Sequence, residues 1–138
     1  MSAVLKLLAL YWLTLPVFFV IDMFWLGIVA RGFYRRQFGN LLAPQFNWTA
    51  AVAFYLLFIA GILVFAVAPG LKRESLTHAV MLGALFGLIS YATYDLTNLA
   101  TLRGWPLPLT IVDMLWGALL SALVSAASFM IGKKFLGI

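Results

Sequence analysis

Cysteine is absent from this chain of 138 residues, and charged side chains are scarce. The lack of cysteine excludes disulfide bonds, thiolate metal sites and a cysteine nucleophile. Only 9% of the residues are charged, while 65% are hydrophobic. A soluble domain is typically about one-quarter charged because its surface must be hydrated. Most of the exterior of this protein must therefore face lipid.

Four long apolar stretches take up most of the chain. A helix needs roughly 20 apolar residues to cross a bilayer, and the stretches that qualify lie at about 7–30, 49–68, 79–102 and 109–131. The second is expected to end at Pro69-Gly70, and the short loop after the third requires a tight antiparallel turn. We therefore predict an all-α membrane protein, a four-transmembrane-helix antiparallel bundle forming one transmembrane domain over residues 1–138.

The net charge of +5 comes from lysines and arginines near the ends of these stretches. Basic side chains there anchor helices to anionic headgroups, so we expect membrane lipid as a partner and no nucleic acid. Four spans place both termini on one side of the membrane, and the basic residues divide five to four between the two sides. This small excess favours cytoplasmic termini in a multi-pass protein of the inner (cytoplasmic) membrane.

Three of the four acidic residues lie inside predicted spans: Asp22, Asp95 and Asp113. An ionisable group in the bilayer core costs on the order of 2.5–3.5 kcal/mol even on the mild insertion scale, so each one needs a reason. At about 1.5 Å per residue, their distances along the chain from the nearest loops place all three roughly 8–14 Å below the same membrane face. We therefore predict one polar layer inside the bundle, on the side of the first and third connectors.

Small residues share helix faces with two of these acids. Two sets recur at every fourth position: Gly83, Gly87, Tyr91 and Asp95, and Asp113, Gly117, Ser121 and Ser125. Because small residues let membrane helices approach closely, both acids are expected to face another helix rather than lipid. A homo-oligomer, where one forms, is expected to use the Gly83/Gly87 face.

A short internal similarity links the first span to the fourth. Residues 20–25 read Val-Ile-Asp-Met-Phe-Trp, and residues 111–116 read Ile-Val-Asp-Met-Leu-Trp. In each segment the tryptophan follows the aspartate by three positions, so both side chains lie on one helix face. The two spans should run antiparallel, as in transporters whose inverted repeats meet at a substrate site. Six residues are too few to establish a duplication.

The acids and the polar and aromatic residues near them form the predicted site. The candidate catalytic residues are Asp22, Asp95, Asp113 and Asn98, and the candidate ligand-binding residues are Trp25, Tyr91, Tyr94, Trp105, Trp116, Arg31 and Arg103. The alternative is that the acids only hold helices together, but interhelical hydrogen bonds average only about 0.6 kcal/mol. No spacing specifies a metal and no cofactor motif is present, so we predict neither a metal nor a cofactor.

These residue types are suited to binding a hydrophobic molecule or to catalysing a reaction on it. A buried carboxyl can act as a general acid, and indole faces can stabilise a developing cation. We therefore predict that the pocket binds or transforms a lipidic small molecule, and the sequence leaves open whether the protein is an enzyme. Two alternatives remain: a proton-coupled transporter or channel subunit, and a non-catalytic accessory subunit of a membrane assembly. The apolar half of the bundle near the termini favours a one-sided pocket over a path across the bilayer.

Several stretches carry a resemblance to a known family. They are Ile-Asp-Met-Phe-Trp-Leu-Gly at 21–27, Phe-Tyr-Arg-Arg at 33–36, Tyr-Ala-Thr-Tyr-Asp-Leu-Thr-Asn-Leu-Ala-Thr at 91–101, Gly-Trp-Pro at 104–106 and Val-Asp-Met-Leu-Trp-Gly at 112–117. Together they resemble the bacterial membrane family called domain of unknown function 2177, over nearly the whole chain. The Tyr-Asp-Leu-Thr-Asn segment is the most specific part. The resemblance implies a bacterial integral membrane protein and implies no activity.

Overall fold

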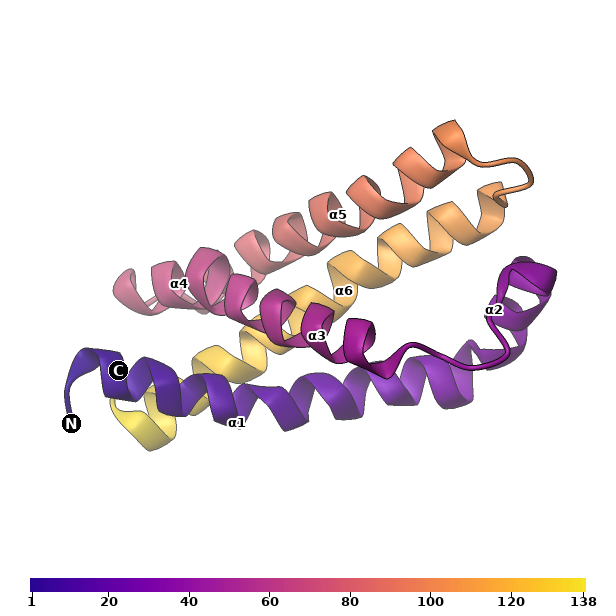
Figure 1. Cartoon of the computed structure of the whole chain (residues 1–138). Helices are drawn as coiled ribbons and strands as arrows, with labels where there is room; N and C mark the ends of the chain where they lie inside the picture. The colour runs from indigo at the N-terminus through magenta and orange to yellow at the C-terminus, as the bar shows by residue number, and fades with distance from the viewer.

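A computed structural model describes residues 1–138. Helices contain 86% of the residues, and no strand is present. Four helical segments are long and apolar enough to cross a membrane: Ala3–Val29, Trp48–Lys72, Leu76–Thr101 and Leu107–Leu136. The two termini lie at the same end of the bundle (Figure 1). The predicted all-α architecture with four membrane-spanning helices is confirmed.

Each membrane helix is assembled from one or more elements. The first comprises α1 (Ala3–Phe24) and the π-helical segment η1 (Trp25–Val29). The connector contains α2 (Arg31–Phe38) and the 3-10 turn η2 (Gly39–Leu41). The second membrane helix comprises α3 (Trp48–Ile62), the π-helical η3 (Leu63–Val67) and α4 (Ala68–Lys72). The third is α5 (Leu76–Thr101), and the fourth comprises α6 (Leu107–Ile131) and the π-helical η4 (Gly132–Leu136).

Capping side chains define where three of the helices begin. The Ser2 hydroxyl accepts a hydrogen bond from the Leu5 amide at 3.2 Å, and the Ser75 hydroxyl accepts one from the His78 amide at 3.1 Å. Asn47 caps α3 in the same way. Such caps satisfy amide groups that have no partner inside the helix. They explain why the first and third helices begin before the predicted positions 7 and 79.

The second membrane helix does not end at Pro69-Gly70 as expected, but continues to Lys72. A proline inside a helix lacks an amide hydrogen and its ring crowds the preceding turn, so it usually breaks the helix. Here the preceding turn is the wider π-helical segment η3, which leaves room for the Pro69 ring. Gly70 then packs closely on α5, where a Cβ atom would lie 2.9 Å from Cα of Ala79.

Helices α5 and α6 form the closest pair in the bundle. Gly83 and Gly87 of α5 fit against α6, and a Cβ atom on Gly83 would lie 2.8 Å from the Ser121 carbonyl oxygen. On α6, Gly117 leaves room for the Tyr91 ring. The Gly83/Gly87 face is therefore occupied by α6 of the same chain and is not open to a second copy, contrary to the expected oligomer contact.

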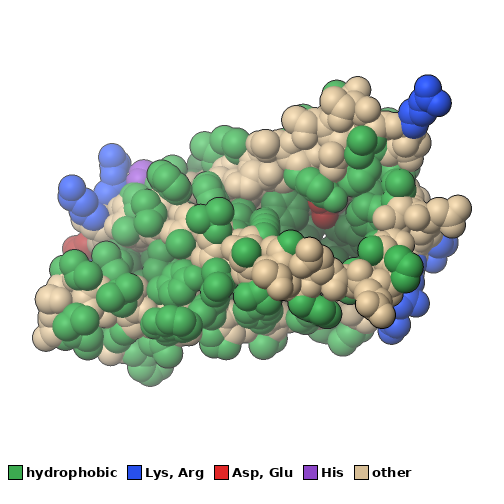
Figure 2. Space-filling model, in the orientation of Figure 1, with side chains coloured by type: hydrophobic (Ala, Val, Ile, Leu, Met, Phe, Trp, Pro, Cys, Tyr) green, Lys and Arg blue, Asp and Glu red, His purple; other side chains and the backbone are tan.

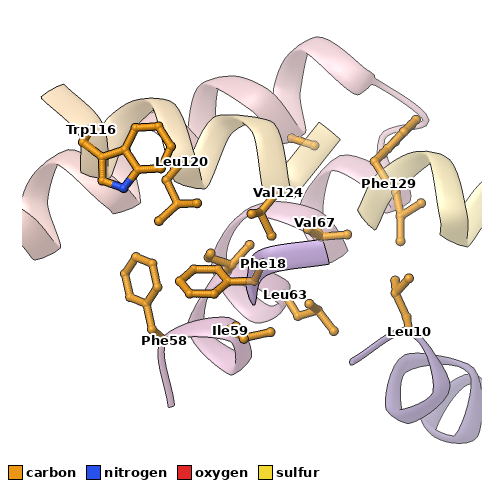
Figure 3. Close-up of a cluster of buried hydrophobic side chains, with 13 residues drawn as sticks. Leu10, Phe18, Phe58, Ile59, Leu63, Val67, Trp116, Leu120, Val124 and Phe129 are labelled. Carbon is orange, nitrogen blue, oxygen red and sulfur yellow. The ribbon is translucent and has the colours of Figure 1, made fainter. Parts of the chain in front are cut away.

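An apolar core fills the half of the bundle near the termini. It joins α1, η3 and α6 through fully buried side chains such as Leu10, Phe18, Val67, Leu120 and Val124 (Figure 3). Helix α5 packs against η3 and α4, whereas α3 and α5 diverge toward the opposite end (Figure 1). This divergence opens the bundle at the depth of the aspartates.

Large apolar side chains also cover much of the outer surface, while basic groups lie toward the two ends (Figure 2). Exposed examples on all four membrane helices are Val20, Leu57, Met81 and Leu115. Water would penalise this amount of exposed apolar surface. The membrane helices therefore sit in lipid, and the protein is a multi-pass membrane protein.

Candidate functional site

Asp22 of α1 lies inside the bundle with 2% of its surface exposed. Its Oδ1 atom accepts a hydrogen bond from the Trp116 indole nitrogen at 3.1 Å, and its Oδ2 atom accepts one from the Tyr55 hydroxyl at 2.9 Å. The donors come from α6 and α3, so this carboxyl joins three helices. Both oxygens have a donor, so hydrogen bonds compensate for the burial of this polar group.

Asp113 lies near the start of α6 and is linked to the connector rather than to α3. Its Oδ1 atom accepts a hydrogen bond from the Tyr34 hydroxyl at 2.7 Å. The Tyr34 oxygen in turn accepts one from the Trp25 indole nitrogen at 3.2 Å. Burial, together with the negative charge of Asp113, raises the pKa of the Tyr34 hydroxyl above its usual value. Tyr34 therefore remains protonated and can keep donating to Asp113.

Asp95 of α5 is fully buried, and no group donates a hydrogen bond to either of its carboxyl oxygens. The ionisable group that faces Asp95 is the Asp113 carboxyl, and no hydrogen bond joins the two in this structure. The ion pair in this chain joins Lys133 to Glu74 at the end near the termini. Asp95 and Asp113 thus form a carboxyl pair without a cationic partner.

The two similar segments, 20–25 and 111–116, meet at this site. Trp25 and Trp116 stack with their ring centroids 4.4 Å apart and their planes 8° from parallel. Each indole nitrogen is then linked by hydrogen bonds to the aspartate of the other segment. Trp116 donates directly to Asp22, and Trp25 reaches Asp113 through the Tyr34 hydroxyl. The expected antiparallel arrangement of the two spans produces this exchange.

A cavity of about 490 Å³ lies beside these groups, between α3 and α5. Asp22, Asp113 and Trp116 form its polar wall, and Tyr55, Tyr91 and Tyr94 contribute aromatic rings. Figure 2 shows this hollow from outside, with an acidic side chain visible inside it. The volume falls in the range of about 300–1,000 Å³ that is typical of small-molecule sites. The cavity therefore brings carboxyls, rings and apolar walls together on one side of the bundle.

Some predicted residues lie away from this cavity. Asn98 is half-buried but its side chain makes no hydrogen bond and does not line the cavity. Arg103 is exposed in the loop before α6 and pairs with no carboxylate. Trp105 is buried, donates to the Thr110 hydroxyl at 3.1 Å and packs edge-on against Tyr94. Arg31 lines a neighbouring pocket instead.

The sequence reasoning missed Tyr34 and Tyr55, the residues that donate hydroxyl groups to two of the carboxyls. A signal for Tyr55 was present, since it is the one polar side chain in the middle of the very apolar stretch 49–68. A signal for Tyr34 was weaker, because it lies among aromatic and basic residues that are typical of the membrane surface. Only the fold of the connector back onto α6 reveals its role.

The comparisons with known proteins give one match. A family model described as "Predicted membrane protein (DUF2177)" matches residues 7–130, which is most of the chain. No curated protein and no solved structure matches the chain. The matched region contains all three buried aspartates, both stacked tryptophans and the two tyrosines that bind the carboxyls. On this match, the chain belongs to the DUF2177 family of predicted membrane proteins.

Proposed function

We propose that this protein takes up an amphiphilic molecule from the bilayer and exchanges a proton with it at the Asp95–Asp113 pair. The observation that carries the proposal is the unpartnered Asp95 carboxyl against Asp113, next to a cavity that opens between α3 and α5. Asp22, Tyr91, Tyr94, Trp25 and Trp116 shape the remainder of the site. The residues Asn98, Trp105 and Arg103 have no contact that gives them a part in this chemistry.

Access from lipid is supported by an apolar groove of about 600 Å³ on the same side of the bundle. Its walls include Phe58 and Phe65 of the second membrane helix and Phe86 of α5. The groove and the carboxyl cavity share Phe54 and Ser90 in their linings. A hydrocarbon chain can therefore lie in the groove while a polar group of the same molecule reaches the carboxyls.

The arrangement of the carboxyls supports proton exchange. Two adjacent carboxylates in a medium of low dielectric repel each other strongly unless they share a proton. No cationic side chain pairs with them, and Tyr34 already donates to Asp113. Asp95 is therefore the group best suited to hold the shared proton, and Asp113, which lines the cavity, is the group best placed to deliver it. Asp22 has a different part, since donors already occupy both of its oxygens.

The simpler explanation, that the acids only join helices, fits Asp22 better than Asp95. A joining group is expected to form hydrogen bonds across the interface, as Asp22 does to α3 and α6. Asp95 is buried without a donor, which costs roughly 1–3 kcal/mol or more for a buried polar group. A purely structural role does not account for that cost, whereas a site for proton transfer does.

The test compares Asp95→Asn with Thr97→Val, a control on the exposed face of α5 whose hydroxyl bonds only to its own helix backbone. Each protein is purified in detergent, its melting temperature is measured, and the bound amphiphiles are identified by mass spectrometry. We expect Asp95→Asn to fold but to carry an amphiphile that differs in chemical form or amount from that of the wild type. Asparagine keeps hydrogen-bonding capacity but cannot transfer the proton. The same amphiphile in the same amount with both variants would contradict the proposal.

A second candidate, proton-coupled transport, is favoured by one observation. Buried hydroxyl groups continue from the carboxyls along α6 toward the termini, at Ser121, Ser125 and Ser128, and Ser128 lies 2.8 Å from the Thr14 hydroxyl. Transport predicts proton uptake into liposomes containing the purified protein, and Ser125→Ala should slow it relative to the exposed control Thr93→Val. An absence of proton flux in the wild type would eliminate this candidate and leave the lipid-binding site.

A further inference from the structure

We infer that Arg31 and Arg35 bind the phosphate group of a membrane lipid in a pocket next to the carboxyl cavity. The inference rests on the proposed function, because it assigns a chemical class to the amphiphile: a lipid that carries a phosphate. It also assigns a separate subsite for this group, formed by side chains that the proton-exchange chemistry does not use.

The pocket has a volume of about 580 Å³ and lies between α1, α2 and the start of α3. Arg31 and Arg35 both line it. They are four residues apart on α2, so their side chains project from one helix face. Neither forms an ion pair, since the one ion pair of the chain joins Lys133 to Glu74. Two free guanidinium groups on one face offer the donor geometry that phosphate oxygens accept most strongly.

The remaining walls indicate a lipid rather than a soluble phosphate compound. Phe38, Phe46 and Trp48 surround the pocket with aromatic rings. Arg31 lies two residues after the end of the first membrane helix at Val29, and Trp48 begins the second. The pocket therefore lies at the level where tryptophan and arginine meet lipid headgroups. A soluble phosphate would leave these rings exposed, whereas a lipid covers them with its glycerol or chain carbons.

The pocket and the carboxyl cavity are neighbours with a common wall. Leu26, Ala51 and Tyr55 line both of them. Tyr34 also lines the arginine pocket, and its hydroxyl donates to Asp113 in the cavity. The carboxyls repel a phosphate, and the arginines attract it. The two pockets therefore orient an amphiphile with its phosphate at the membrane surface, another polar group of the molecule at the carboxyls, and its hydrocarbon chain in the apolar groove.

The test is a titration of the purified protein with dioleoyl phosphatidic acid, followed by native mass spectrometry. Dioleoyl glycerol is the matched probe, because it has the same chains without the phosphate. We expect the wild type to bind one phosphatidic acid at least tenfold more tightly than dioleoyl glycerol. The Arg31→Gln/Arg35→Gln variant should lose this preference, while Arg103→Gln, an exposed arginine outside the pocket, should keep it. Inorganic phosphate in large excess over the lipid should not compete.

Each other result counts against the inference. Equal affinity for the two probes, or an unchanged preference in the double variant, removes the phosphate subsite. An equal loss in Arg103→Gln shows that surface charge alone attracts the lipid. Full competition by inorganic phosphate would show that the pocket binds a soluble phosphate compound rather than a lipid. The wild type's preference between the two probes is measured by binding alone, without any proton transfer, so a failure of the proton-exchange proposal leaves this result unchanged.

Discussion

Trp25 stacks on Trp116 with ring planes 8° from parallel, and each ring directs its indole nitrogen to the opposite half of the site. The stack joins two hydrogen-bonded chains. In one chain Trp116 and Tyr55 donate to Asp22, and in the other Trp25 and Tyr34 lead to Asp113. Asp22 thus joins α1 to α3 and α6, whereas Asp113 joins α6 to α2. The stack places these two environments side by side.

The first prediction separates the two tryptophans. Trp116→Phe keeps an aromatic ring in the stack but leaves Oδ1 of the buried Asp22 without its donor. We expect the free energy of unfolding to fall by about 1–3 kcal/mol, the cost of an unsatisfied buried polar group. Trp25→Phe should cost less, because Tyr34 still donates to Asp113. Melting temperatures in detergent give the comparison. A larger loss for Trp25→Phe would contradict the assigned hydrogen bonds.

The second prediction concerns the Tyr34 hydroxyl. Tyr34→Phe removes the donor to Asp113 and so alters the carboxyl that we propose to share a proton with Asp95. We expect it to reproduce the change in bound amphiphile seen with Asp95→Asn. The control is Tyr11→Phe, whose hydroxyl donates to the Leu56 carbonyl oxygen at 2.8 Å, away from the carboxyls. Mass spectrometry of the purified proteins tests this, and identical results for the two tyrosine variants would refute it.

The third prediction tests the close contact between α5 and α6. A Cβ atom on Gly87 would overlap the Gly117 carbonyl oxygen and the Ser121 side chain. We expect Gly87→Ala to lower the free energy of unfolding by about 1–3 kcal/mol, as overpacking does in a well-packed core. Gly27→Ala is the matched control, because nothing lies within 4 Å of the position that its Cβ atom would take. A melting temperature for Gly87→Ala equal to that of the control would show that the helices are not in contact there.

The fourth prediction concerns the arrangement across the membrane. Because the chain contains no cysteine, a single cysteine at Ser2, Gln45, Arg73 or Arg103 reports its own side without background labelling. A membrane-impermeant thiol reagent should label positions 2 and 73 from one side, and positions 45 and 103 from the other. Four membrane helices require this division. Labelling of positions 45 and 73 from the same side would contradict the fold.

The sequence by itself determined which segments enter the membrane and at what depth the acids lie. Hydropathy selects the spans because lipid accepts only long apolar helices, and the rise per residue then sets the depth of each aspartate. The spacing of four residues also places Gly83, Gly87 and Asp95 on one helix face. That spacing does not indicate which helix covers the face. Only the fold shows that α6 of the same chain covers it, rather than a second copy.

The tertiary structure alone decided how the acids are paired. Asp22 and Asp113 occur in nearly the same sequence segment, yet one accepts from Tyr55 on α3 and the other from Tyr34 on α2. These partners are 33 and 79 residues away along the chain. Local periodicity carries no information about contacts at such separations, because they depend on how whole helices and the connector pack. For the same reason the sequence could not separate Arg31, which lines a pocket, from Arg103, which lies in a loop outside that pocket.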